Sequence, residues 1–148
     1  MKYKSYVIAF LMGLSSLYSQ NNFEYWQQHV DYIMDVKVDV KTFQYGGTQK
    51  LIYTNNSPDD LEMVFYHLFY NAFQPGSEMD VRSLTIADAD SRVSDRISKL
   101  QKEDIGFINV VSLTQNSVPI NYSVVGTVLE VELDTPIKSG ESVVFEMV

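Results

Sequence analysis

The side chains that could do metal or acid–base chemistry are few and far apart. The chain has two histidines, His29 and His67, and no cysteine. A zinc site needs several His, Cys, Asp or Glu ligands at a suitable spacing, such as H-E-x-x-H, and none occurs here. A lone histidine in an aromatic segment is more often a packed residue than a ligand. The sequence therefore predicts no catalytic residue, no cofactor-binding residue and no metal ligand in this chain.

Other motifs with chemical potential are incomplete. Asp31, Asp35 and Asp39 share one side of an alternating segment, but lysines lie among them, which is typical of a solvated strand face. Asp88-Ala-Asp90 starts like a calcium-binding loop and then lacks the Gly and Glu that such a loop requires. Gly46-Gly47 is not followed by the Gly-Lys-Ser/Thr of a phosphate-binding loop. None of these segments predicts a bound ion or nucleotide.

The only tryptophan, Trp26, lies in a polar lead at residues 20–29. Two interpretations stay open for it. The first is that Trp26 packs on the edge of the domain, which is the commoner arrangement for a single tryptophan beside a core. The second is that its ring stacks on a sugar or contacts a partner protein.

The first residues have the pattern of a secretory signal peptide. Lys2 and Lys4 precede a short apolar run that ends at Leu17, and the small residue Ser19 follows. The run is too short to cross a bilayer as a helix, so we expect residues 1–19 to be removed on export and no transmembrane span to remain. An exported chain without cysteine fits the periplasm or the exterior of a bacterial cell.

Composition indicates a folded, acidic protein. The chain has 148 residues, enough for one domain with a real core, and 45% of them are hydrophobic. Its formal net charge of −8 becomes −10 when the two lysines of the signal peptide are removed. A protein this acidic repels phosphate backbones, so nucleic acid is not an expected partner.

Alternating hydrophobicity predicts an antiparallel hairpin near the start of the domain. In the segment Val30–Lys41 the even-numbered residues are apolar and are expected to face a core. A tight turn is expected at Gly46-Gly47, followed by a return strand at Thr48–Thr54.

Later segments predict a helix and further strands. Leu61–Tyr70 is apolar on both faces, which favours a central strand covered on both sides. Residues 88–102 have helical spacing, with Asp88 or Ser91 as the N-cap. A strand is then expected at Gly106–Thr114, a hairpin turn at Asn116–Pro119, and inward-facing residues at Leu129, Val131 and Leu133.

These elements predict a mainly β fold: an antiparallel β-sandwich with one short crossover helix. One non-catalytic β-domain is expected over residues 20–148. Its last apolar strand, Glu141–Val148, is expected to leave an unpaired edge. On that ground we expect the domain to be incomplete at its C-terminus.

Several segments together resemble the first domain of the aminopeptidase N-like zinc metallopeptidases. Tyr53-Thr-Asn-Asn-Ser-Pro-Asp59 matches that family's turn, and His67-Leu-Phe-Tyr-Asn-Ala-Phe73 matches the end of its next strand. Asn116-x-Val-Pro-Ile-x-Tyr122, Leu129-x-Val-x-Leu133 and Pro136-Ile-Lys-Ser-Gly140 match its later strands. Ser117 stands where the family often has Gly. The likeness covers roughly residues 30–148.

The resemblance implies a saddle-shaped β-sandwich that packs against a thermolysin-like catalytic domain. In that family two His and a Glu bind zinc, and a second Glu activates water. None of those residues is present here, so no functional residue is carried over. The implied function is the N-terminal domain of an exported zinc metallopeptidase, with its own downstream catalytic domain and peptide substrates as partners.

Two other functions stay open. The chain could be a stand-alone exported β-sandwich that binds a glycan or an envelope protein, since sandwich folds carry many binding functions. It could also belong to an inactive family member that serves as a scaffold. Residues of this chain do not separate an active parent enzyme from an inactive one.

Overall fold

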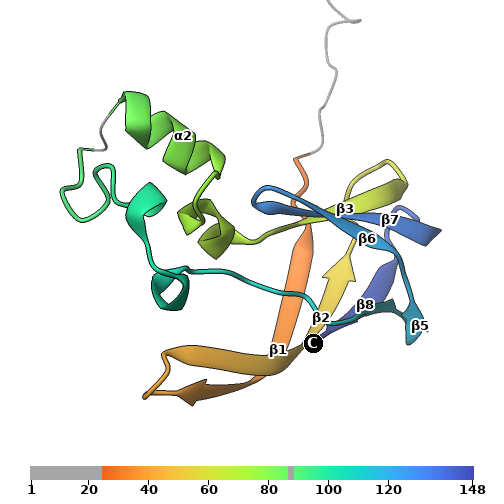
Figure 1. Cartoon of the computed structure of the whole chain (residues 1–148). Helices are drawn as coiled ribbons and strands as arrows, with labels where there is room; N and C mark the ends of the chain where they lie inside the picture. The colour runs from red at the N-terminus through yellow and green to blue at the C-terminus, as the bar shows by residue number, and fades with distance from the viewer. Residues whose placement is uncertain (1–24, 87–88) are drawn as a thin grey trace, which may run out of the picture.

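Two antiparallel β-sheets form the body of the protein. The computed structural model describes residues 25–86 and 89–148, so the predicted signal peptide and Asp88 lie outside the described residues. The larger sheet has the order β1-β2-β8-β4-β5 and the smaller one β3-β7-β6 (Figure 1). The strands are β1 (His29–Asp39), β2 (Gln44–Thr54), β3 (Leu61–His67), β4 (Leu113–Gln115), β5 (Val118–Pro119), β6 (Tyr122–Val125), β7 (Val128–Ile137) and β8 (Ser142–Met147). The prediction of an antiparallel β-sandwich is confirmed.

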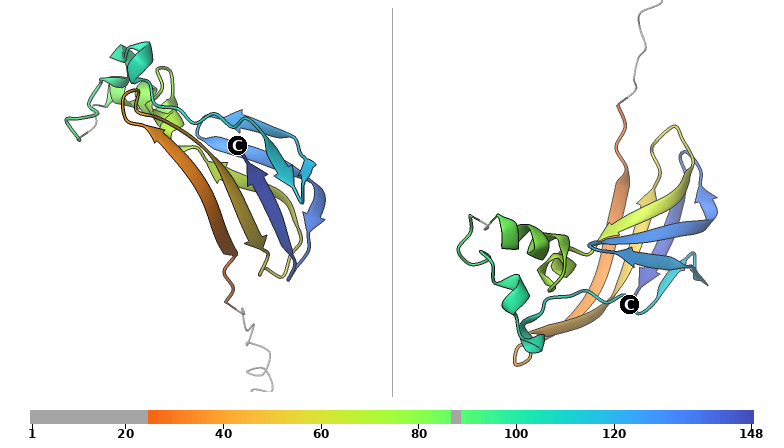
Figure 2. Two further views of the ribbon diagram at one scale, coloured as in Figure 1. Left: turned by 90° about the horizontal axis from the view of Figure 1, so that it is seen from below. Right: turned by 45° about the horizontal axis from the view of Figure 1, so that its top comes forward.

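The core lies between the two sheets. Phe145 of β8 and Leu51 of β2 point inward from the larger sheet, and Leu129 and Val131 of β7 point inward from the smaller one. The ring of Tyr66 on β3 meets Phe145 edge-on across the gap, at 6.3 Å between ring centroids. The predicted inward face of β7 is therefore confirmed. Figure 2 shows the larger sheet curving around the smaller one.

One buried asparagine ties the two sheets together at one end of the sandwich. Asn55 follows β2 and is 0% exposed. Its Nδ2 donates to the carbonyls of Asp59, at 2.8 Å, and Ile137, at 2.9 Å. Its Oδ1 accepts from the backbone N–H and the hydroxyl of Ser57 and from Nε2 of Gln28. Because Ile137 ends β7, this single side chain links the larger sheet, the smaller sheet and the residues before β1.

The backbone of Asn55 completes the same connection. Its N–H donates to the carbonyl of Glu141, and its carbonyl accepts from Gly140. Ser139 donates its hydroxyl to the carbonyl of Ser57. The turn before β3 and the turn between β7 and β8 are therefore held against each other, which fixes the separation of the sheets at this end.

The hairpin between β1 and β2 turns at a different place from the one predicted. The turn lies at residues 40–43, and Gly46 and Gly47 are inside β2. Asp39 drives the turn by accepting hydrogen bonds from the N–H groups of Lys41 and Thr42, a common way for aspartate to start a turn. Gly47 is needed because β1 passes so close that a Cβ there would overlap the carbonyl oxygen of Asp35.

Two predicted strand positions are wrong. β3 lies at the edge of the smaller sheet rather than at its centre, and its outer face is not covered, since Phe65 on that face is exposed. β8, which we expected to leave an unpaired edge, pairs with β2 on one side and β4 on the other. Propensity alone did not reveal these neighbours, because strand order depends on long-range pairing. The predicted strand at Gly106–Thr114 is mostly irregular, and only its end enters β4.

The crossover helix exists but was predicted at the wrong residues. Helix α2 spans Glu78–Thr85 and is capped by Ser77, whose hydroxyl accepts from the N–H of Asp80. The described part of 88–102 holds a turn and the short 3-10 helix η3 (Ile97–Lys99). Ser94 takes a positive φ of 41°, which a continuous α-helix does not allow.

The segment between β3 and β4 is a separate helical layer. It contains η2 (Phe69–Phe73), α2, η3 and η4 (Lys102–Asp104), and it lies beside the sheets in Figure 1. Asn71 holds this layer together and to the sandwich: its Oδ1 accepts from the N–H of Ile108, in the chain that leads to β4, at 2.9 Å, and its Nδ2 reaches the carbonyl of Gly126, between β6 and β7, at 3.5 Å. Within the described ranges 25–86 and 89–148, no helix has the length and apolarity to cross a membrane.

We predict that Asn55→Ala will strongly destabilise the fold. The substitution leaves buried groups of Ser57 and Ile137 without partners, and each such group costs about 1–3 kcal/mol. The free energy of unfolding should therefore fall by roughly 3 kcal/mol, as measured by urea denaturation.

Asn56→Ala is the matched control. Asn56 is adjacent and exposed, and its side chain makes one surface hydrogen bond, to the carbonyl of Gln27. We expect a loss under about 1 kcal/mol for this variant. Equal losses for both variants would show that Asn55 does not hold the sheets together.

Candidate functional site

The two histidines lie on different sheets. His29 begins β1 and its Nε2 is 3.2 Å from Oδ2 of Asp31, with both side chains exposed. His67 ends β3 and its ring stacks on Phe69 at 5.2 Å between centroids. In the part of the chain that the structure describes, no group of three or more His, Cys, Asp or Glu residues could hold a metal ion.

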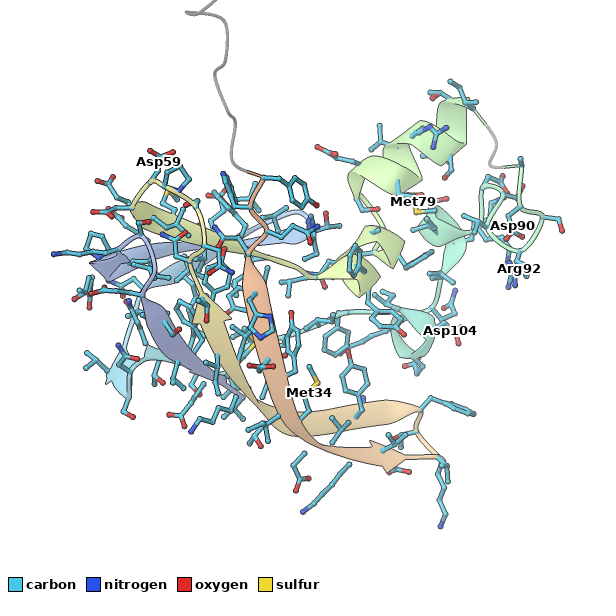
Figure 3. The ribbon with its side chains drawn as sticks, turned by 180° about the vertical axis from the view of Figure 1, so that it is seen from behind. Met34, Asp59, Met79, Asp90, Arg92 and Asp104 are labelled. Atoms are coloured by element: carbon cyan, nitrogen blue, oxygen red, sulfur yellow. The ribbon has the colours of Figure 1, made fainter. Side chains whose placement is uncertain are left out.

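The aspartates have structural roles. Asp31, Asp35 and Asp39 lie on the solvent side of β1, as predicted for an outer strand face. The pKa of Asp39 is lowered, chiefly because the N–H of Lys41 donates to its carboxylate in the turn. Asp90 binds Arg92 at 2.6 Å, and this contact lowers the pKa of Asp90. Figure 3 shows that pair at the far end of the helical layer, away from the sheets.

Trp26 is partly open to solvent. Its side chain is 46% exposed, and Tyr25 before it is more exposed still. The lead is attached to the domain by Gln27 and Gln28, which hydrogen-bond Asn56 and Asn55. Trp26 therefore lies partly exposed at the surface, which is compatible with packing on the edge of the domain and with contact to a sugar or a partner protein.

The most distinctive surface is an exposed apolar face on the β1–β2 hairpin. Strand register puts Tyr32 opposite Leu51, and Leu51 opposite Phe145, so these residues all point to the core side of the larger sheet. The same side continues outward along the hairpin. We call it the inner face, and its members are Tyr32, Met34, Val36 and Val38 of β1 and Tyr45 of β2.

The β1 residues of the inner face were predicted to be buried and are not. The four β1 residues are 53–65% exposed and Tyr45 is 50% exposed. The alternation itself was predicted correctly, since Asp31, Asp35 and Lys37 lie on the opposite side. Figure 3 shows Met34 near the point where the hairpin extends beyond the packed sandwich. Contiguous apolar surface of this kind is characteristic of a contact site for another protein.

Two features cause this exposure: β1 is the edge strand of the larger sheet, and the hairpin is longer than the strand beside it. β8 pairs with β2 only over Gln49–Thr54, so the outer part of the hairpin is a two-stranded arm. The smaller sheet covers Leu51 of β2 but leaves Tyr32, opposite it on the edge strand, 58% exposed, and it does not reach the arm. The ring of Tyr45 comes 6.5 Å from Tyr70 of the helical layer, which covers part of the inner face.

Helix α2 exposes a second apolar surface. Its buried residues are the polar Asp80 and Ser83, whereas Val81 and Leu84 are 57% and 58% exposed. This reverses the usual arrangement, in which the apolar side of a surface helix faces the core. Oδ1 of Asp80 is buried without a hydrogen-bond partner in the described structure. Both surfaces therefore carry apolar residues that the described residues leave uncovered.

Tyr66 places a polar group where the core meets the inner face. Its hydroxyl is buried and has no hydrogen-bond partner among the described residues. Burial raises the pKa of Tyr66, and the nearby Tyr32 hydroxyl raises it further. The group does not ionise at neutral pH, so it offers a hydrogen bond rather than acid–base chemistry.

A hollow of about 320 Å³ lies in the helical layer, between Tyr70, Phe73, Ile97 and Leu100. Arg92 and Arg96 reach its rim, and Arg92 is already bound to Asp90. Its walls are apolar and the hollow is open to solvent. No catalytic arrangement of side chains accompanies it among the described residues.

Comparison with known proteins adds no identification. No protein-family model, no curated protein and no solved structure matches this chain. The residues that carry the resemblance to the zinc metallopeptidases have structural roles here: Asn55 joins the sheets, and Asn71 joins the helical layer to them.

We predict that Tyr66→Phe will leave the free energy of unfolding unchanged or raise it. The hydroxyl that is lost has no partner, so its removal relieves a desolvation cost. Tyr122→Phe is the matched control, because the Tyr122 hydroxyl donates to the carbonyl of Val110 at 3.0 Å. That variant should lose about 1 kcal/mol in denaturant unfolding. A larger loss for Tyr66→Phe than for Tyr122→Phe would contradict the structure.

The raised pKa of Tyr66 also predicts a pH dependence. The unfolded chain loses the tyrosine proton near pH 10, whereas the folded chain holds it to a higher pH. Stability should therefore fall as pH rises above about 10, and Tyr66→Phe should reduce that fall. Thermal melts of both proteins from neutral to alkaline pH measure the difference. Parallel curves would refute the assignment of a buried, neutral hydroxyl.

Proposed function

We propose that this chain is the non-catalytic first domain of an exported zinc metallopeptidase of the aminopeptidase N-like kind. In this proposal it shapes the peptide-substrate cleft, and a domain that follows in the same polypeptide performs catalysis. The observation that carries the proposal is the exposed apolar inner face, continuous with the core. A domain that packs against a second domain needs such a surface, whereas a monomer rarely keeps one exposed.

The resembling residues support the same proposal. Asn55 and Asn71 are the polar centres of the two segments that carry the resemblance, and both are buried and hydrogen-bonded. Buried, hydrogen-bonded residues of this kind stabilise a fold and do not act on a substrate, which is what we expect in a non-catalytic domain. The zinc that the resemblance implies does not fit the described side chains, so in the proposal it is held by residues of the catalytic domain.

A stand-alone binding module is the second candidate. It is favoured by the half-exposed Trp26 beside the exposed Tyr25, because aromatic rings at a surface stack on sugars and contact proteins. A glycan array with the exported protein tests it. Binding that persists unchanged in Trp26→Ala would remove the support that this residue gives.

We predict that the purified chain neither hydrolyses aminoacyl substrates nor retains zinc after dialysis. Elemental analysis and a chromogenic aminopeptidase assay measure the two properties. One tightly held zinc per chain would contradict the expected absence of a metal centre.

The genomic reading frame should encode an H-E-x-x-H motif and a further Glu ligand downstream, and an inactive homologue would lack part of that set.

The packing role has its own test. In the proposed full-length protein, Val38→Gln on the inner face should weaken the contact between the two domains, seen as a lower melting temperature and a loss of peptidase activity. Lys50→Gln on the outer face of β2 is the control and should change neither. Equal behaviour of the two variants would argue against the inner face as the domain contact.

A further inference from the structure

β1 has one edge without a neighbour. It is the terminal strand of the larger sheet, and β2 is its sole partner in the described structure. All eleven residues, His29–Asp39, pair with β2 without a bulge, and the strand contains no proline. A long, regular edge strand offers a row of backbone N–H and C=O groups to another strand.

The other edges of the two sheets are better protected. β5 has two residues and includes Pro119, and β6 has four residues. β3 has seven residues, and its pairing with β7 is interrupted between Leu61 and Met63. Short strands, proline, irregular pairing and charged side chains are the usual ways in which edges are blocked. β1 has only the last of these, in its aspartates and Lys37, and Figure 2 shows it as the outermost strand.

Self-pairing would also support the arm of the hairpin. Beyond Gln49 of β2 the hairpin has two strands only, and an isolated two-stranded ribbon is marginally stable in water. A second β1 strand would make this region four strands wide. It would also place the apolar side chains of one inner face beside those of the other.

The charges on β1 determine how two copies can pair. Full antiparallel overlap of two β1 strands puts Met34, the midpoint of His29–Asp39, opposite itself. Asp31 of each copy then lies opposite Lys37 of the other, and His29 lies opposite Asp39. Tyr32 lies opposite Val36 on the inner face, and on the outer face Ile33 lies opposite Asp35, which is the one pairing of an apolar with a charged residue in this register. Opposite charges that face each other across strands stabilise a pair, and like charges destabilise it.

Neighbouring registers are unfavourable. A shift of two residues in one direction puts Asp31 opposite Asp35, and in the other direction it puts Asp31 opposite Asp39. A shift of one residue puts apolar side chains opposite charged ones at most positions, rather than at the Ile33–Asp35 position alone. Lys37 takes part in no ion pair within the described chain, and Asp31 contacts only His29 of its own strand among the described ion pairs. These charges are therefore available to a partner.

We infer that this protein forms a two-fold symmetric dimer through the edge of β1, with Met34 on the axis and reciprocal Asp31–Lys37 contacts. The larger sheets of the two copies then form one continuous antiparallel sheet. A symmetric dimer is the commonest form of homo-oligomer, and this interface is self-complementary as such a dimer requires. The inference goes beyond the proposed function, because it uses the edge and outer charges of β1 rather than the inner face as a domain contact.

Cysteine cross-linking tests the register, because the chain has no cysteine of its own. Met34→Cys places two thiols opposite each other, with Cα atoms about 5 Å apart, which a disulfide spans. Val36→Cys is the control, since Val36 has the same 53% exposure. Its copies would be separated by four residues along the strand, about 13 Å, which a disulfide does not span. We expect the covalent dimer in the first variant and not in the second.

Charge exchange tests the contact without a covalent bond. Asp31→Lys and Lys37→Asp each place like charges opposite one another twice, and each should raise the dimer dissociation constant about tenfold or more. Mixing the two variants restores both opposite-charge pairs, so a heterodimer should form close to the original affinity. Sedimentation at several concentrations and native mass spectrometry measure the species. Glu103→Lys and Lys102→Asp, which change net charge equally on η4, should leave the dimer unaffected.

The inference is overturned if the unaltered protein stays monomeric at high micromolar concentration. It is also overturned if a mixture of Asp31→Lys and Lys37→Asp does not form a heterodimer with close to the original affinity. The same holds if Val36→Cys cross-links as readily as Met34→Cys. Circular dichroism and thermal melting check that every variant is folded. If a charge variant fails to fold, cross-linking alone decides the outcome.

Discussion

The spacing of the two sheets depends on one buried amide. Asn55 uses both donors and its acceptor oxygen in bonds to groups from the turn before β3, from the end of β7 and from the residues before β1. Each of those groups is buried or partly buried, so an unmade bond there would carry a full desolvation cost. The core between Leu129 and Phe145 packs at the distance that this connection allows. A hydrophobic side chain of equal size would satisfy none of those partners.

The opposite end of the sandwich is open, and this follows from unequal strand lengths. β2 is eleven residues long, whereas β8 pairs with only its last six. The extra length of the hairpin therefore carries Val36, Val38 and Tyr45 beyond the reach of the smaller sheet. Helix α2 repeats the same feature on a smaller scale, with Val81 and Leu84 outward. Both surfaces are made of apolar residues, as buried faces usually are, yet both are exposed to solvent. This combination supports a contact with another protein.

Much of the fold could be predicted because its signals are local. Alternation along β1 and β7 identified which residues share a face, and the Asn116-Ser117 turn formed where predicted, with positive φ at both residues. Failures had two causes. The edge position of β3 depends on strands that are far away in the sequence. The turn after Asp39 and the cap at Ser77 depend on side-chain hydrogen bonds to backbone groups two or three residues away, and these bonds competed with the glycine and helical-spacing signals.

In the candidate site, too, some features depend on the local sequence and others on residues far away along the chain. The sequence by itself determined the antiparallel class, the pairing of apolar with apolar positions, and the acidic, cysteine-free composition, because these depend on residue type and period alone. Tertiary structure decided which apolar faces are covered, because coverage depends on the length and position of strands distant in sequence. It also turned Asn55 from a turn residue into the link between the sheets, since its partners Gln28 and Ile137 lie far from it along the chain.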